Sequence, residues 1–325
     1  MAQAAIDQCL PGCAEPRLII LANHQKPGVS EALDELRPWL AERGTIVAEI
    51  DTCDPAGEND CSPGGPAPTR PAGVADLPEA DLALILGGDG TFLSQARWLI
   101  DAAVPVLGIN FGKLGFLAEY TIDALKRHWP SITAGQCRMT TRMMLEVALF
   151  PENAPHWGEN SELPEPVFAS NAMNDVVITA GPPFRMIELE LAIEPSVAET
   201  SATSFNGDGV ILATPTGSTA YNLAAGGPIV SPGIDGLCVS PICPQSLAFR
   251  PIVYSAHCET WVTIQRANAG TTLMIDGQRS TQLHAGQQVR ITKHPNELPL
   301  VHNPDWNYWK MLAHKMHWAA HPRRE

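Results

Sequence analysis

The sequence predicts two domains: an α/β N-terminal domain with a parallel sheet, followed by a β-rich C-terminal domain. In the first part of the chain, short apolar runs alternate with helical segments, which is the order of a parallel sheet with crossover helices. After residue 137, helical periodicity gives way to short β-rich segments separated by turn residues, which indicates antiparallel sheets. The chain has 325 residues, 45% of them apolar, and this is enough for two separate cores.

The N-terminal elements alternate between strand and helix. The run from Leu18 to Ala22 is apolar throughout, as expected of a strand buried on both faces of a sheet. Ser30 fits the N-cap of the helix that follows. Residues 53–79 are rich in Pro, Gly, Ala and Asp without periodicity, and they predict a flexible surface loop. Strands are expected at 18–22, 45–50, 81–86 and 104–109, and helices at 30–43, 92–101 and 121–129.

The second part of the chain reads as a series of short strands. Residues 151–166 predict another loop, and residues 306–318 predict a terminal amphipathic helix whose aromatic side chains are packing groups. The strands are expected at 144–150, 176–178, 187–193, 210–213, 261–265, 273–275 and 288–291. These patterns divide the chain into an α/β domain at 1–137, a β-rich domain at 138–300 and a helical tail at 301–325.

Charge and cysteine usage exclude several classes of protein. The formal net charge is −14, and no basic run is present, so nucleic-acid and anionic-membrane partners are not expected. No stretch approaches the roughly 18 apolar residues of a membrane helix, and the first residues do not resemble a secretory signal. The 8 cysteines contain no C-x-x-C pair. We therefore expect a cytoplasmic protein with reduced thiols and no zinc site.

A glycine-rich loop, Gly87-Gly88-Asp89-Gly90-Thr91, directly follows an expected strand. In an open α/β sheet, ligands bind beyond the carboxyl ends of the strands. Glycines let backbone N–H groups approach phosphates, and the following helix presents its positive end to an anion. A lone aspartate among such donors can orient or deprotonate an attacking hydroxyl, as phosphoryl transfer requires. From these residues alone, a tight turn with Asp89 as a cap explains the loop equally well.

Two further segments carry polar groups suited to a nucleotide, although neither a P-loop nor a G-x-G-x-x-G fingerprint is present. Asn174-Asp175 combines an amide and a carboxylate, which can donate to and accept from the hydroxyls of a ribose; by itself the pair is more simply a turn or a cap. Residues 214–222, Thr-Pro-Thr-Gly-Ser-Thr-Ala-Tyr-Asn, offer hydroxyls, backbone groups and an aromatic face. Asp208-Gly209 and Asp276-Gly277-Gln278 are expected to form hairpin turns.

Together these motifs resemble the NAD kinase family. The loop at 87–91 is shared with diacylglycerol and sphingosine kinases. Its combination with Gly108 to Phe116, Asn174-Asp175 and the segment 208–221 is typical of a much narrower group of proteins, the NAD kinases. The resemblance covers roughly residues 17–318. It implies an NAD kinase-like two-domain fold with the site between the domains. The activity it implies is transfer of the γ-phosphate of ATP to the 2′-hydroxyl of the adenosine ribose of NAD, giving NADP.

The resemblance also implies a role for each matching residue. Asp89 corresponds to the general base or hydroxyl-orienting carboxylate, Phe116 to an aromatic side chain packed on the adenine, and Asp208 to a carboxylate near the nicotinamide. Ala224 stands where many members carry Ser. The expected phosphate loop comprises Gly87, Gly88, Gly90 and Thr91, and the expected NAD-binding residues are Asp89, Gly90, Phe116, Asn174, Asp175, Arg185, Asp208, Thr219, Ala220, Tyr221, Asn222, Leu223, Ala224 and Gln278.

The implied partners are NAD and ATP, in a homodimer or homotetramer. Mg²⁺ is expected with ATP, and no dedicated protein metal site is expected, since this ion commonly binds through substrate phosphates and one or two carboxylates. Two alternatives stay open at this point. A lipid kinase would share the loop at 87–91 but would need an apolar cleft for acyl chains. A nucleotide-binding regulatory protein without turnover would lack a working base, and the presence of Asp89 argues against it.

Overall fold

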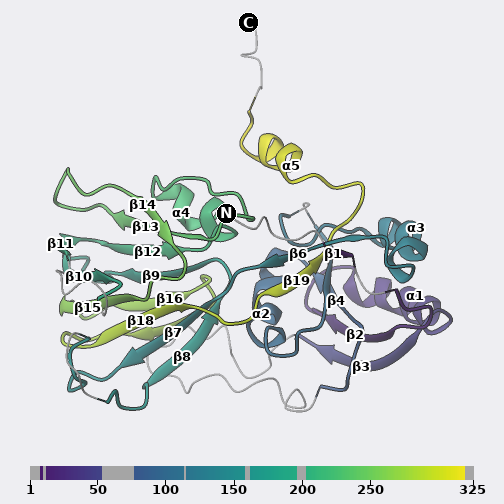
Figure 1. The fold of residues 1–325 in the computed structure, drawn as a ribbon, viewed down its shortest axis with the longest axis horizontal. Helices are drawn as coiled ribbons and strands as arrows, with labels where there is room; N and C mark the ends of the chain where they lie inside the picture. The colour runs from purple at the N-terminus through teal and green to yellow at the C-terminus, as the bar shows by residue number, and fades with distance from the viewer. Residues whose placement is uncertain are drawn as a thin grey trace, which may run out of the picture.

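The computed structural model describes residues 8–9, 12–52, 77–112, 115–157, 162–195 and 203–318. Most of the expected loop at 53–79 and part of that at 151–166 lie outside the described residues. Figure 1 shows two bodies side by side, one with helices around a sheet and one built mainly of strands. The predicted fold class, an α/β domain with a mostly parallel sheet followed by a β-rich domain, is confirmed.

A seven-stranded sheet forms the N-terminal body, in the order β1-β6-β19-β5-β4-β2-β3. The four strands from β5 to β3 are mutually parallel, and β19 runs parallel to β5 but antiparallel to β6. All four strands predicted in this part of the sequence are present. The strands are β1 (Gln8–Cys9), β2 (Arg17–Ala22), β3 (Thr45–Asp51), β4 (Leu82–Gly87), β5 (Val106–Asn110), β6 (Arg138–Arg142) and β19 (Leu298–Val301).

Helices cover both faces of this sheet. Leu18 and Ile20 of β2 pack on one face with α1 (Val29–Ala41) and α3 (Ile122–Thr133), while Ile19 and Leu21 pack on the other face with α2 (Asp89–Leu99). This is why β2 is apolar at every position rather than at alternate positions. The prediction of Ser30 as N-cap is wrong by two residues: Gly28 caps α1 in a left-handed conformation, which glycine adopts without steric cost.

Two six-stranded antiparallel sheets form the C-terminal body, in the orders β11-β10-β15-β18-β7-β8 and β14-β13-β12-β9-β16-β17. Their facing apolar side chains form one core. The first sheet comprises β7 (Leu145–Phe150), β8 (Phe168–Ala172), β10 (Ile187–Ile193), β11 (Thr203–Gly207), β15 (Thr260–Arg266) and β18 (Gln288–Lys293). The second comprises β9 (Asp175–Thr179), β12 (Gly209–Ala213), β13 (Gly236–Ile242), β14 (Ile252–Ser255), β16 (Thr272–Ile275) and β17 (Arg279–Gln282).

The two predicted Asp-Gly turns have different outcomes. Asp276 and Gly277 have φ of 51° and 65° and join β16 to β17, as a type I′ hairpin requires. The prediction of a hairpin at Asp208 is wrong. The strand before Asp208 pairs in one sheet and the strand after it pairs in the other, so the chain changes sheets there.

The chain passes between the two bodies more than once. It leaves the N-terminal sheet after β6 and returns to it through β19. The predicted boundary at 137 lies directly before β6 and the predicted boundary at 300 lies within β19, so both of these strands belong to the N-terminal sheet although the prediction placed β6 and most of β19 in the β-rich domain. The tail then forms α5 (Tyr308–Lys315), within the predicted range of 306–318. No helix among the described residues is both long enough and apolar enough to cross a membrane.

Candidate active site

The site begins at the edge of the N-terminal sheet where three neighbouring parallel strands end. The chain after β2, the loop after β4 and the loop after β5 are bonded to one another there. The N–H of Asn23 donates to the Leu86 carbonyl at 3.1 Å, and the N–H of Phe111 donates to the Gly87 carbonyl at 2.8 Å. These contacts hold the glycine-rich loop at the edge where α/β proteins bind ligands.

A close side-chain contact explains Gly87, and Gly88 lies against the end of the flexible side chain of Lys26. A Cβ at Gly87 would lie 2.4 Å from Oγ1 of Thr91. A Cβ at Gly88 would lie 2.3 Å from Nζ of Lys26, which donates a hydrogen bond to the Gly87 carbonyl at 2.9 Å. Gly88 is extended and is the N-cap of α2, with no side-chain cap. Gly87 is needed for the close approach of Thr91 rather than for a left-handed backbone.

Asp89 is the first residue of α2, and its carboxylate is held by the backbone of the segment after β5. Its oxygens accept N–H groups of Phe116 at 2.8 Å and of Leu117 and Ala118 at 3.1 Å each. Gly115 permits this approach, because a Cβ there would lie 1.9 Å from Oδ1 of Asp89. A carboxylate offers about four acceptor positions, so three amides orient Asp89 and still leave capacity for a hydroxyl.

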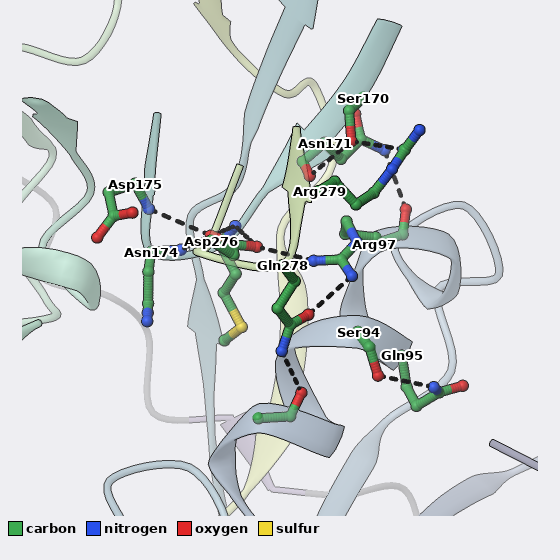
Figure 2. A network of polar contacts seen from close by, with 12 residues as sticks. Ser94, Gln95, Arg97, Ser170, Asn171, Asn174, Asp175, Asp276, Gln278 and Arg279 are labelled. Carbon is green, nitrogen blue, oxygen red and sulfur yellow. Dashed lines mark hydrogen bonds and ion pairs between the residues drawn. The ribbon is translucent and has the colours of Figure 1, made fainter. Parts of the chain in front are cut away.

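A buried carboxylate on the other body shapes the turn that carries Asn174 and Asp175. Asp276 accepts the backbone N–H groups of Met173, Asn174 and Asp175, with the shortest bond, 2.7 Å, from Asn174. In Figure 2, the side chains of Asn174 and Asp175 extend to the side away from Arg97. The backbone of the pair is thereby fixed.

Asp175 is buried, and its charge is disfavoured. Burial and the nearby negative charge of Asp276 raise the pKa of Asp175 to about 7, and the backbone N–H of Tyr221 opposes the rise. Burial also raises the pKa of Asp276, while Arg97 opposes that rise. Strongly perturbed carboxylates gathered at one place are typical of functional sites.

Arg97 connects the two bodies (Figure 2). From the last turn of α2, its Nη1 lies 3.4 Å from Oδ2 of Asp276 and its Nη2 donates to Oε1 of Gln278 at 2.8 Å. Nε2 of Gln278 then donates to the Gly90 carbonyl in the first turn of the same helix, at 2.7 Å. The side chains of Arg97 and Asp276 are only 9% and 0% exposed. The β16–β17 turn therefore contacts both ends of α2.

The hydroxyl-rich segment folds into the short helices η1 (Gly217–Thr219) and α4 (Tyr221–Ala224). Asn222 is fully buried, and its amide bonds the carbonyls of Ser218 and Pro228 and the hydroxyl of Ser240. Its side chain is therefore committed to holding the segment together. Tyr221, by contrast, is 44% exposed. The predicted ligand residues that remain accessible here are Thr219, Ala220, Tyr221, Leu223 and Ala224.

Phe116 lies beside the C-terminal helix. Its ring centroid is 5.9 Å from that of Tyr308, and Nζ of Lys315 lies 4.8 Å from it. The backbone N–H of Phe116 bonds Asp89, so this residue connects α5 with the carboxylate at the start of α2.

Arg185 and Asp208 lie away from the other predicted site residues. In the antiparallel pair β9 and β12, Asp175 is opposite Ala213 and Thr179 is opposite Gly209. Asp208 is thus displaced from Asp175 by five residues of strand, or about 17 Å. Arg185, which precedes β10, lies toward the same far end of the strands. Within one chain, the structure therefore brings together Asp89, Asn174, Asp175, Gln278 and the 217–224 segment, but not Arg185 or Asp208.

Sequence reasoning missed Lys26, Arg97 and the anchoring role of Asp276. Asp276 was expected only as part of a turn, and it forms that turn while also binding three backbone N–H groups. Arg97 gave a weak signal as a cation in the last turn of the helix after the glycine loop. Lys26 belongs to no motif. Among the described residues, no group of three or more His, Cys, Asp or Glu side chains is arranged to hold a metal ion.

Comparison with known proteins identifies relatives over most of the chain. The ATP-NAD kinase N-terminal domain matches residues 69–137, and the ATP-NAD kinase C-terminal domain matches residues 173–303. The NAD kinase of Rhodopirellula baltica is 32% identical over 316 residues, which is 97% of this chain and 90% of that protein. The NAD kinase of Chromobacterium violaceum is 36% identical over 304 residues, 93% of this chain and 96% of that protein.

Solved structures of the same kind share the fold. The yeast NADH kinase complexed with NADH has a TM-score of 0.73 at 23% identity, covering 95% of this chain and 89% of that one. The NAD kinase from Archaeoglobus fulgidus in complex with ATP has a TM-score of 0.64 at 20% identity, covering 93% and 98%. The lipid-kinase alternative is excluded by the relatives and the domain matches together. The chain belongs to the NAD kinase family.

Proposed function

We propose that this protein transfers the γ-phosphoryl group of ATP to the 2′-hydroxyl of the adenosine ribose of NAD, giving NADP and ADP. The observation that carries the proposal is the placement of Asp89. Asp89 lies in the glycine-rich loop and is the first residue of α2. The next residue, Gly90, accepts a hydrogen bond from Gln278, which belongs to the β16–β17 turn that also binds the backbone of Asn174 and Asp175. A carboxylate, a phosphate-binding loop and a ribose-binding pair are thus held by one network.

Asp89 acts on the attacking hydroxyl. A ribose hydroxyl is a weak nucleophile at neutral pH, and a positioned base contributes typically ~10²–10⁴-fold. Asp89 accepts the proton as the bond from O2′ to the γ-phosphorus forms and the bond from that phosphorus to the β–γ bridging oxygen breaks. The three amides on Asp89 keep the carboxylate in one orientation while its remaining acceptor position faces the hydroxyl.

The second body holds the acceptor. Asn174 and Asp175 bind the ribose hydroxyls, and Thr219 to Ala224 surround the adenosine, with the side chain of Tyr221 partly exposed for contact. Phe116 packs on the adenine, and Gln278 keeps the first turn of α2 next to this body. Mg²⁺ enters with ATP as part of the substrate. This ion usually keeps phosphate and water ligands and needs only one or two carboxylates from the protein, and Asp89 is the carboxylate of the phosphate loop.

A homodimer or homotetramer in the cytoplasm completes the proposal. In one chain, Asp208 lies five residues of strand from Asp175, and Arg185 lies toward the same far end. In this proposal a second subunit presents them to the nicotinamide half of NAD. Five described cysteines are free, which supports a reducing compartment.

The test is an NADP-forming assay with a matched pair of variants. The protein is mixed with ATP, Mg²⁺ and NAD, and NADP is detected with an NADP-specific dehydrogenase, with NADH and polyphosphate tried in parallel. We expect Asp89→Asn to bind NAD but to lose turnover by at least ~10²-fold. Asp123→Asn, which changes an exposed carboxylate at the start of α3, is the control and should keep full activity. Unchanged turnover in Asp89→Asn would contradict the assigned role, and no NADP with any donor would favour a regulatory, binding-only protein.

A further inference from the structure

Lys26 lies at the phosphate loop, and no carboxylate of the described residues pairs with its charge. It follows β2, and its Nζ donates to the Gly87 carbonyl at 2.9 Å. Nζ also lies 2.3 Å from where a Cβ of Gly88 would be and 3.9 Å from where a Cβ of Gly112 would be. The ammonium is therefore enclosed by backbone from the two glycine-containing loops that follow β4 and β5.

Within the part of the chain that the structure describes, the one hydrogen-bond partner of the ammonium is neutral. An ammonium has three N–H donors, and one of them is used on the Gly87 carbonyl. Among the described residues, no carboxylate forms an ion pair with Lys26, and its side chain is half-buried. Removing a charge from water without an opposite charge is unfavourable, so this position is suited to an anion that arrives with the substrate.

Among the described residues of the three loops, Lys26 is the one Lys or Arg. These residues are 23–28, 87–91 and 110–112, and Lys113, which follows in the third loop, lies outside the described residues. The protein as a whole carries a net charge of −14, so long-range attraction does not draw a polyphosphate to the site. A local cation must do so, together with backbone N–H groups.

We infer that Lys26 is a binding residue for the phosphate chain of the donor, and that its two remaining N–H groups contact phosphate oxygens beside Gly87 and Gly88. The inference rests on the proposed function, because it takes the donor to be a polyphosphate-bearing nucleotide. Lysine binds phosphate as a point charge, and its flexible stem lets the ammonium shift from the Gly87 carbonyl as the phosphates enter. Lys26 acts on the donor, whereas Asp89 acts on the acceptor hydroxyl.

A purely structural role is the competing explanation, since Lys26 also bonds the loop. Three substitutions separate the two roles. Lys26→Gln keeps a hydrogen-bond donor for the Gly87 carbonyl but removes the charge, Lys26→Met removes both, and Lys26→Arg keeps the charge. Lys126→Met, on α3 and outside the site, is the matched control.

The readout is the KM for ATP and the KM for NAD, measured separately, with inorganic tripolyphosphate as a competitive inhibitor. For Lys26→Gln and Lys26→Met we expect the KM for ATP and the inhibition constant of tripolyphosphate to rise about tenfold or more. The KM for NAD should stay within about threefold, and Lys26→Arg should recover most of the loss. The control should match wild type, and the melting temperature of Lys26→Gln should stay within a few degrees of wild type.

Two results would overturn the inference. One is a Lys26→Gln variant with an unchanged KM for ATP, which would assign the residue to holding the loop. The other is an equal rise in both KM values, which would show general damage to the site. Failure of the proposed function is separately visible, because wild-type protein would then make no NADP. Direct binding of Mg·ATP to wild type and Lys26→Gln would still test the inference in that case.

Discussion

Replacing Arg97 by Met removes the cation that faces a fully buried carboxylate. Methionine occupies a similar volume without charge or donors, so the change isolates the electrostatic and hydrogen-bonding roles of Arg97. The side chain of Asp276 would keep three backbone N–H groups but lose its ion pair, and Gln278 would lose its donor. The expected result is a less stable protein whose stability depends more steeply on pH.

The size of the effect follows from the contacts. Breaking a buried ion pair costs about 3–5 kcal/mol. The 3.4 Å separation of Arg97 and Asp276, together with the amides that still bind Asp276, favours the lower end of that range. The lost bond to Gln278 adds about 1 kcal/mol. With about 1.5 °C for each kcal/mol in a chain of 325 residues, we expect the melting temperature to fall by about 6 °C.

The pH dependence gives a sharper test than the magnitude. Burial raises the pKa of Asp276, and Arg97 holds it down. In Arg97→Met this pKa rises further, so the folded variant binds a proton that the unfolded chain does not, and stability is lost as pH rises through the folded pKa. The gap in melting temperature between wild type and variant should therefore be smaller near pH 5.5 than near pH 8.

The assay is thermal unfolding of both proteins at several pH values, with Arg37→Met as the control. Arg37 pairs with Asp34 and Glu49 at the surface, where its side chain is 41% exposed, so its loss should cost no more than about 1 kcal/mol. A fall below 3 °C in Arg97→Met, or a gap that does not change between pH 5.5 and pH 8, would refute the reasoning.

Three further substitutions test other parts of the site and fold. Gly115→Ala would place a Cβ 1.9 Å from Oδ1 of Asp89; displacement of that carboxylate should lower kcat by tenfold or more in the NADP-forming assay. Asp175→Asn removes a carboxyl whose pKa burial raises to about 7; wild type loses stability as pH rises from about 4 to about 7, so the variant should gain in melting temperature over wild type between pH 5 and pH 8. His302→Ala removes a donor to the buried Glu119, at 2.9 Å, and should cost about 3 kcal/mol by denaturant titration.

Much of the fold was predictable because its apolar strands are distinctive. The run Leu18 to Ala22 is buried on both faces, which leaves a continuous apolar signature. The edge strand β17 was missed because its side chains are all half-buried and polar, so no alternation marks it. The strand β19, Leu-Pro-Leu-Val, was missed because it is short and contains a proline. Its pairing with β5 depends on a return of the chain that no local pattern indicates.

The site was predictable to the extent that glycine marks it. The loop around Asp89 needs glycine for close contacts, and the glycines next to Asp89 are visible in the sequence. Arg97 and Asp276 are 179 positions apart, and each looks ordinary in its own segment. Asp208 illustrates the opposite error, because an Asp-Gly pair is typical of hairpins although here it joins strands of two sheets. Contacts between residues far apart in the sequence could therefore not be predicted, whereas the local need for glycine could.

The contacts of the β16–β17 turn with α2 carry a last consequence. Gly90 and Arg97 are seven residues apart on one helix, a span of about 10 Å. A rigid rod held at one point can still tilt, whereas one held near both ends cannot, so Gln278 on Gly90 and Asp276 on Arg97 act as one constraint on the position of Asp89. Removing either contact frees the tilt, and removing the second adds little.

In kcat for NADP formation, Arg97→Met and Gln278→Ala should each cause a loss, and the double variant should lose little more than the worse single variant. In thermal stability the two losses should accumulate more fully, short only of the Arg97–Gln278 hydrogen bond that both substitutions remove, because the Asp276 and Gly90 contacts are broken separately. Losses in kcat that multiply in the double variant would mean that the two contacts support catalysis independently. The turn would then not fix the helix as a unit, since a shared geometric constraint can be lost only once.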